Sequence, residues 1–144
     1  MAAELGQFLK LAREYAYSEI EKTGMPIKMH VDLSIKKGKQ LSEKLSADPQ
    51  IVEIGILMMD CLIGQSIKEG RIQGHIKMSF EKTIELLEKN NASENIKENI
   101  KHCVLEHHGT SKFYSIESLF LFFYREFYLK TTRATRWLIR LSFR

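Results

Sequence analysis

The chain of 144 residues is long enough to bury one hydrophobic core without help from disulfides or structural metals. With 44% hydrophobic and 28% charged residues and no low-complexity segment, its composition excludes a disordered or fibrous chain. The net charge of +4 is local, because residues 118–144 hold six basic residues and one acidic residue, which gives +5 there and −1 for residues 1–117. The charge therefore does not indicate a nucleic-acid-binding body.

The cysteines and the first residues bear on the cellular compartment. Cys61 and Cys103 are the only cysteines. Because Cys61 adjoins an apolar run, we expect reduced core thiols rather than a disulfide or a cysteine-based zinc site. The opening residues, MAAELGQFLKLAREYAY, carry Glu4 and lack both a basic leader and an unbroken apolar stretch, so no signal peptide is expected. With no transmembrane segment expected either, the sequence indicates a cytoplasmic protein.

The N-terminal part of the chain predicts two amphipathic helices. Apolar residues recur at helical spacing over residues 5–20, with charged residues on the other face, and Gly24 and Pro26 end this element. A second helix begins near Lys28 and carries its apolar side chains inward, while lysines and glutamates fill its outer face. His30 lies in the first turn of this helix.

The third predicted helix is the apolar run IVEIGILMMDCLIG, residues 51–64. Asp48 and Pro49 precede it as N-cap and first helical residue. The run has almost no polar face, so we expect the helix to be buried. Asp60 stands near its end, and a carboxylate in a buried place is costly unless a cation, a hydrogen-bond donor or a metal ion pairs with it.

A loop and a fourth helix are expected next. The loop spans residues 64–74 and contains Lys68 and Arg71, two cations that could meet an anion. The helix runs from His75 to about Lys89, with apolar side chains on one side and His75 at its N-terminal edge.

The fifth predicted helix begins at Ser93, a good N-cap, and ends near a pair of histidines. Its apolar stripe predicts that His107 faces the core, that His102 falls to the flank and meets solvent, and that His108 neighbours His107 at the helix end. No stretch has the alternation of a strand, so the sequence predicts an all-α fold, a compact helical bundle.

Five residues from four of these helices are expected at helix ends or on inward faces: His30, Asp60, His75, His107 and His108. Metal sites in helical bundles are assembled in this way, and imidazole with carboxylate suits zinc, iron, manganese or nickel. Each histidine alone is more often a hydrogen-bonded core residue than a ligand. The order and spacing of the set favour a metal site.

Four motifs in this order resemble the HD-domain superfamily of metal-dependent phosphohydrolases. They are a His that opens a helix (MHVDLSIKKGKQLSEKL), an apolar helix that ends in Asp (DPQIVEIGILMMD), a His after a polar loop (GHIKMSFEKTIELLEK) and a His-His helix end (IKHCVLEHHG). The resemblance covers about residues 27–117. It implies one HD-like domain over residues 1–144, with an N-terminal helix in residues 1–26 and a basic, aromatic segment in residues 118–144.

The resemblance also implies roles for the residues that match. His30 matches the first metal-binding His and Asp60 the catalytic Asp of the His-Asp pair. His75, His107 and His108 match positions that bind a second metal or the substrate phosphate in some branches. Lys68 and Arg71 would then lie near the phosphate. The implied cofactor is a divalent ion of iron, manganese, zinc, nickel or magnesium, and the implied substrate is a phosphate ester or nucleotide.

Two departures from that family weaken the expected metal site. Met59 stands where the family has a His before the Asp, and a thioether is a poor ligand for hard or borderline ions. The family also places an Asp in a following helix, yet no Asp follows Asp60 in this chain, and Glu126 is the one acidic stand-in there. We therefore expect partial or absent metal occupancy.

The segment 118–144 has three interpretations, since it holds eight of the fourteen aromatic residues. It is a last core helix with aromatic residues at helical spacing, a stretch where the coding frame or family pattern was lost, or a surface for membrane or nucleic acid. Two functions remain open. The protein is a metal-dependent phosphohydrolase, or it is a non-catalytic regulatory or scaffolding module that has lost its metal site.

Overall fold

The computed structural model describes residues 2–124, which form seven α-helices and one 3-10 helix and contain no strand. The elements are α1 (Ala2–Thr23), α2 (Lys28–Leu45), α3 (Pro49–Met58), α4 (Ile63–Lys68), η1 (Ile72–Gly74), α5 (His75–Lys89), α6 (Glu94–Glu106) and α7 (Ile116–Tyr124). The all-α fold predicted from the sequence is confirmed. Residues 1 and 125–144, which include Glu126, lie outside the described residues.

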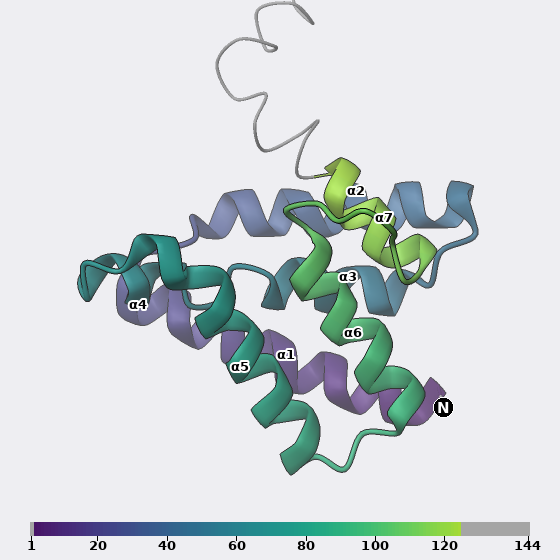
Figure 1. Ribbon diagram of the computed structural model, residues 1–144, viewed down its shortest axis with the longest axis horizontal. Coiled ribbons are helices and arrows are strands. Elements are labelled where there is room, and N and C mark those ends of the chain that lie inside the picture. Colours follow the sequence, from purple (N-terminus) through teal and green to yellow (C-terminus); the bar gives the residue numbers. More distant parts are fainter. Residues whose placement is uncertain (1, 125–144) are drawn as a thin grey trace, which may run out of the picture.

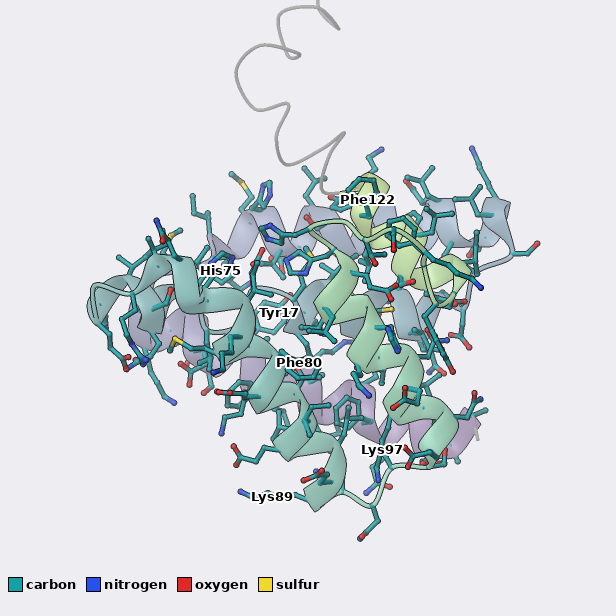
Figure 2. The ribbon with its side chains drawn as sticks, viewed as in Figure 1. Tyr17, His75, Phe80, Lys89, Lys97 and Phe122 are labelled. Carbon is teal, nitrogen blue, oxygen red and sulfur yellow. The ribbon has the colours of Figure 1, made fainter. Side chains whose placement is uncertain are left out.

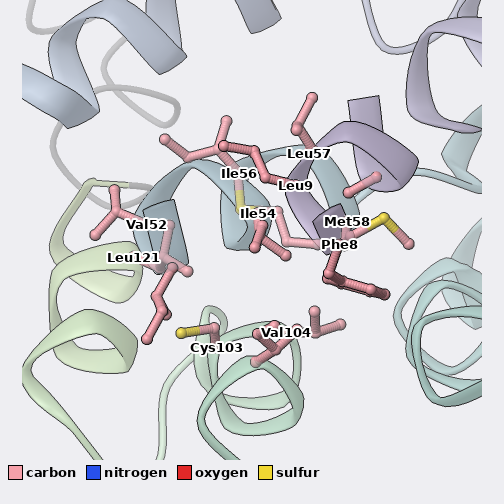
Figure 3. Close-up of a cluster of buried hydrophobic side chains, with 14 of the residues drawn as sticks. Phe8, Leu9, Val52, Ile54, Ile56, Leu57, Met58, Cys103, Val104 and Leu121 are labelled. Atoms are coloured by element: carbon pink, nitrogen blue, oxygen red, sulfur yellow. The ribbon is translucent and has the colours of Figure 1, made fainter. Parts of the chain in front are cut away.

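Helix α3 is the centre of the core. All eight residues from Ile51 to Met58 are buried, which confirms the prediction from their apolar run. Pro49 opens the helix, and Oδ1 of Asp48 accepts hydrogen bonds from the backbone N–H groups of Gln50 and Ile51 at 2.8 and 3.3 Å. Figure 1 shows α3 between α2 and α1, with α5 and α6 joined by a short loop. Figure 3 shows α1, α6 and α7 contributing side chains around it.

One charged side chain, Glu53, lies inside this apolar helix with its side chain 1% exposed. Arg13 of α1 donates from Nε to its Oε1 at 2.6 Å, and Lys39 Nζ of α2 lies 2.7 Å from its Oε2. Because the two cations come from different helices, Glu53 joins α1 and α2 to α3. A buried carboxylate with two cationic partners is far less costly than an isolated one.

The prediction of a loop over residues 64–74 is wrong in part, since this stretch contains most of α4 and all of η1. Helix α4 lies against the end of α1, where a Cβ on Gly64 would be 2.0 Å from Oγ1 of Thr23. The missing side chain therefore permits this close approach. Six residues give too little periodicity for a helix to be recognised from the sequence.

Helix α7 packs on α2, α3 and α6. Phe120, Leu121 and Tyr124 are buried, whereas Phe122 is half-buried and its ring lies 5.2 Å from that of Phe113. Helical spacing in the sequence predicts an inward face of Leu119, Phe122, Phe123, Phe127 and Lys130. The structure instead buries Phe120, Leu121 and Tyr124, so the inward face is rotated. Phe127 and Lys130 of the predicted face lie outside the described residues.

The stretch Pro49–Lys68, which contains α3 and α4, is the one stretch within residues 2–124 long and apolar enough to cross a membrane. In the structure 67% of it is buried among the other helices. Core helices of globular proteins pass the same test, so this stretch is weak evidence for a membrane span.

Candidate metal centre

Three helix ends bring the candidate residues together. Asp60 lies in the turn that follows α3, and His75 is the first residue of α5. His107 and His108 follow directly after α6. Figure 2 shows His75 at the start of α5 with its side chain directed toward the interior of the molecule. The predicted positions of these residues at helix ends are therefore observed.

The imidazoles of His75 and His107 converge on one carboxylate oxygen. His75 Nε2 lies 3.2 Å from Oδ1 of Asp60, and His107 Nε2 lies 3.7 Å from the same oxygen. The ring of His108 is 4.3 Å from that of His107 and 5.7 Å from that of His75, measured between centroids. One ligand atom each from Asp60, His107 and His108 lie within 4.8 Å of one another. Four of the five predicted residues thus form one cluster.

The backbone fixes which nitrogen of two rings carries hydrogen. His75 Nδ1 lies 2.6 Å from the carbonyl oxygen of Ile72, and His107 Nδ1 lies 2.5 Å from that of Val104. A carbonyl only accepts, so Nδ1 of each ring must donate. In a neutral ring Nε2 then presents its lone pair, and in both residues it faces Asp60. Metal-binding histidines have this arrangement, with the second nitrogen donating to a carbonyl or carboxylate.

Two polar atoms at the centre of the cluster are buried without a hydrogen-bond partner in the described residues. Oδ1 of Asp60 and Nε2 of His107 are inaccessible to solvent and make no hydrogen bond within residues 2–124. Two acceptor atoms that face each other repel unless a proton or a metal ion lies between them. Burying such atoms without a partner is costly. Three imidazoles and a carboxylate suit zinc, iron, manganese or nickel, whereas magnesium prefers an all-oxygen set. The donor set therefore fits a borderline divalent ion.

The same contacts govern the charge of Asp60. Burial raises the pKa of its carboxyl, but His107 and His75, when their Nε2 atoms carry protons, outweigh burial and hold that pKa well below its usual range. The carboxyl is therefore ionised at neutral pH, which is the form that binds a cation.

His30 lies near Asp60, outside the group of residues described above. It lines a cavity of about 30 Å³ together with Met59, Asp60 and four neighbours: Pro26, Val31, Ser34 and Ile56. That volume holds about one water molecule. Met59 is 4% exposed and occupies the wall where the HD family would place a His. His30 thus shares a cavity with Asp60 but stands apart from the group formed by Asp60, His107 and His108.

The two residues expected at the substrate phosphate have other partners. Lys68 Nζ donates to the carbonyl oxygen of Lys22 near the C-terminal end of α1, at 2.8 Å. Arg71 is exposed and pairs with Glu69. Contact with a phosphate would require both side chains to leave these partners, so their proposed role stays a prediction.

His102 is not the solvent-facing residue that its place on α6 suggested. Its Nδ1 lies 2.7 Å from Oε1 of Glu106, and its Nε2 lies 3.4 Å from Oε2 of Glu98. Its ring stacks on Tyr114 with centroids 4.4 Å apart. The glutamates four residues before and after it were a readable signal for these pairs, whereas the stacking depends on the loop after α6.

Comparison of the chain with protein-family models, with curated proteins and with solved structures gave no match. The resemblance of residues 27–117 to the HD-domain superfamily therefore stays a prediction. The geometry of Asp60 and the histidines is independent of that resemblance, since it rests on the contacts above.

Proposed function

We propose that the protein is a metal-dependent phosphohydrolase that acts on a phosphate ester or a nucleotide. The observation that carries this proposal is the pairing of Oδ1 of Asp60 with Nε2 of His107, two buried acceptor atoms without a hydrogen bond in the described residues. Asp60, His75, His107 and His108 would hold one divalent ion of zinc, iron, manganese or nickel.

The chain's own residues prepare this site. The carbonyls of Ile72 and Val104 orient the rings of His75 and His107 and direct their Nε2 lone pairs toward Asp60, as metal ligands require. Asp60 stays ionised because its pKa is lowered. A divalent ion in such a site supplies a water of lowered pKa and positive charge to offset that of a phosphate.

His30 extends the site toward α2. It lines the small cavity beside Asp60, which has room for about one water molecule. An imidazole there can hold or move a proton near the carboxylate. Lys68 and Arg71 have no place in this step while they keep their present partners.

The metal part of the proposal is tested by elemental analysis and by calorimetric titration of the chelator-treated protein with Zn²⁺, Mn²⁺, Ni²⁺ and, without oxygen, Fe²⁺. We expect one site, weakened by about 10- to 100-fold or more in His107→Gln, because a ligand is lost. His102→Gln is the matched control, since His102 lies on the same helix but pairs with glutamates. Equal binding by both variants, or no binding by the intact chain, would refute the site.

The chemical part needs a separate measurement. The protein loaded with each metal should hydrolyse members of a panel of nucleoside phosphates and aryl phosphates, and His107→Gln should lose this activity while His102→Gln keeps it. A metal-binding protein with no turnover on any member would contradict the phosphohydrolase proposal.

Such a result would support the second candidate function, a non-catalytic regulatory or scaffolding module. Two observations favour that alternative. The buried Met59 offers a thioether where the family has a ligand, and Lys68 is tied to the backbone at Lys22. A module of this kind would bind the metal or a phosphorylated ligand without converting it.

A further inference from the structure

The outer face of α2 exposes aliphatic side chains that the packing of the bundle leaves uncovered. Met29 is 78% exposed and Leu33 is 54% exposed, and Ile27 just before the helix is also exposed. Because Met29 and Leu33 are four residues apart on a helix, they lie on the same face, one turn from each other. Single exposed apolar residues are common, whereas these two adjoin and form one continuous apolar patch on the helix.

Basic residues continue this face toward the C-terminal end of α2. Lys36, Lys37 and Lys44 are exposed and make no ion pair within residues 2–124. Of the other charged residues of the helix, Lys28 pairs with Asp32, and Lys39 pairs with the buried Glu53. Glu43 makes no ion pair within residues 2–124. The unpaired charges of α2 therefore sum to +2, from three lysines and one glutamate. The α2 face, defined here as Met29, Leu33, Lys36, Lys37 and Lys44, is aliphatic at one end and cationic at the other.

The part of the chain that follows the described residues is also basic. Helix α7 contacts α2 and ends at Tyr124, and Figure 1 shows its C-terminal end beside α2. Residues 125–144, which follow, contain six basic residues and one acidic residue. The chain thus continues from a helix that contacts α2, and its following residues have a strongly basic composition.

We propose that the α2 face binds the surface of a bilayer that contains anionic phospholipids. Met29 and Leu33 enter the boundary between headgroups and acyl chains, and Lys36, Lys37 and Lys44 lie among the negative headgroups. Exposed aliphatic residues beside lysines on one helix face are the features that interfacial helices use. Single-stranded nucleic acids are bound instead by cations together with aromatic stacking platforms, and the α2 face has no aromatic residue.

This proposal is independent of the proposed hydrolase activity, although the two surfaces are neighbours. His30, which lines the cavity beside Asp60, lies between Met29 and Leu33 on the same helix. Docking of the α2 face would place that cavity close to the bilayer surface.

The experiment uses the intact 144-residue chain and sedimentation with vesicles of phosphatidylcholine, alone or with phosphatidylserine. We expect binding to the anionic vesicles that weakens as salt is raised, and little binding to phosphatidylcholine alone. The double variant Met29→Ser/Leu33→Ser should bind at least about 10-fold more weakly, since burying such side chains supplies the apolar part of the affinity. Leu45→Ser is the matched control, because Leu45 is 51% exposed on α2 but points away from this face.

The charged end of the face is tested in the same assay. Lys36→Glu/Lys37→Glu should lose most of the binding to anionic vesicles, whereas Lys89→Glu should keep it. Lys89 is exposed at the far end of α5, and Figure 2 labels it on the side of the molecule opposite α2. Because all these side chains are exposed, the melting temperatures of the variants should match that of the unchanged protein within a few degrees, about the range expected of surface substitutions.

Three outcomes would overturn the proposal. The intact chain sediments with no vesicle, or the α2 variants bind vesicles as well as their controls do, which would assign binding to residues outside α2. In the third outcome, the intact chain binds an oligonucleotide at physiological salt but binds no vesicle, and Lys36→Glu/Lys37→Glu does not bind the oligonucleotide. That result would assign the face to nucleic acid.

Discussion

His107 Nε2 lies 3.7 Å from Oδ1 of Asp60, and both atoms are buried without a hydrogen bond in the described part of the chain. Because Nδ1 of His107 donates to the carbonyl of Val104, a neutral ring can offer only a lone pair to the carboxylate. The contact is favourable when the ring is protonated or when a cation binds both atoms. The stability of the metal-free protein should therefore depend on pH through this pair.

The first prediction concerns Asp60→Asn in the presence of a chelator. The lowered pKa of Asp60 means that the unfolded carboxyl, with a pKa of about 3.9, takes up its proton before the folded one does. The stabilisation that Asp60 contributes is thus present above pH ~4 and is lost as the pH falls through the folded pKa. The free energies of unfolding of the two proteins should converge as the pH falls from about 5 toward 2.

Urea unfolding between about pH 2 and pH 7 measures this convergence. Glu81→Gln is the control, since Glu81 is exposed and forms only a 3.8 Å pair with Lys77. A difference between Asp60→Asn and the unchanged protein that stays constant over this range would refute the prediction.

The second prediction concerns the buried carboxylate of α3. Glu53→Ala should lower the free energy of unfolding by about 1.5–3 kcal/mol, since it leaves a cavity and removes the carboxylate that joins Arg13 and Lys39 to α3. Glu81→Ala, at an exposed position of α5, should change it by less than about 1 kcal/mol. Thermal and urea unfolding measure both values. A cost for Glu53→Ala no greater than that for Glu81→Ala would show that the buried ion pairs contribute nothing to stability.

Much of the fold follows from local patterns in the sequence. The burial of α3 was predicted because Asp48 and Pro49 mark its start and its residues are almost all apolar. The bounds of α5 were predicted from its single apolar side, and they run from His75 to Lys89 as expected. Helix α4 was missed, because its six residues are held by packing of Gly64 on Thr23, a contact between segments far apart in the chain.

The candidate site could be predicted only as far as the placement of residues at helix ends. The histidines after α6 and at the start of α5 were expected near Asp60, and the structure places His75, His107 and His108 there. The directions of long side chains could not be predicted. Lys68 lies between Asp60 and His75 in the chain, as the prediction required. Its ammonium group, however, donates to a carbonyl oxygen near the C-terminal end of α1 and does not point into the pocket.

The last prediction concerns the C-terminal part of the chain. Leu121 of α7 is fully buried, and its Cδ1 would lie 2.3 Å from a Cβ on Gly55, so α7 packs directly on the backbone of α3. Phe120 and Tyr124 are each 5% exposed. A chain that ends at residue 117 lacks all three side chains, and each large buried side chain removed costs about 2–5 kcal/mol. Their sum is comparable with the whole stability of a domain, about 5–15 kcal/mol.

We therefore expect the chain that ends at residue 117 not to fold and the chain that ends at residue 130 to melt with the intact protein. Circular dichroism and thermal unfolding of the three chains measure this. Leu121→Ala in the intact chain is the accompanying variant, with an expected loss of about 2–5 kcal/mol that locates the effect in the packing of α7 on α3. Equal melting of the two shortened chains would show that α7 does not hold the core together, and a lower melting temperature for the chain that ends at residue 130 would show that residues 131–144 contribute to it.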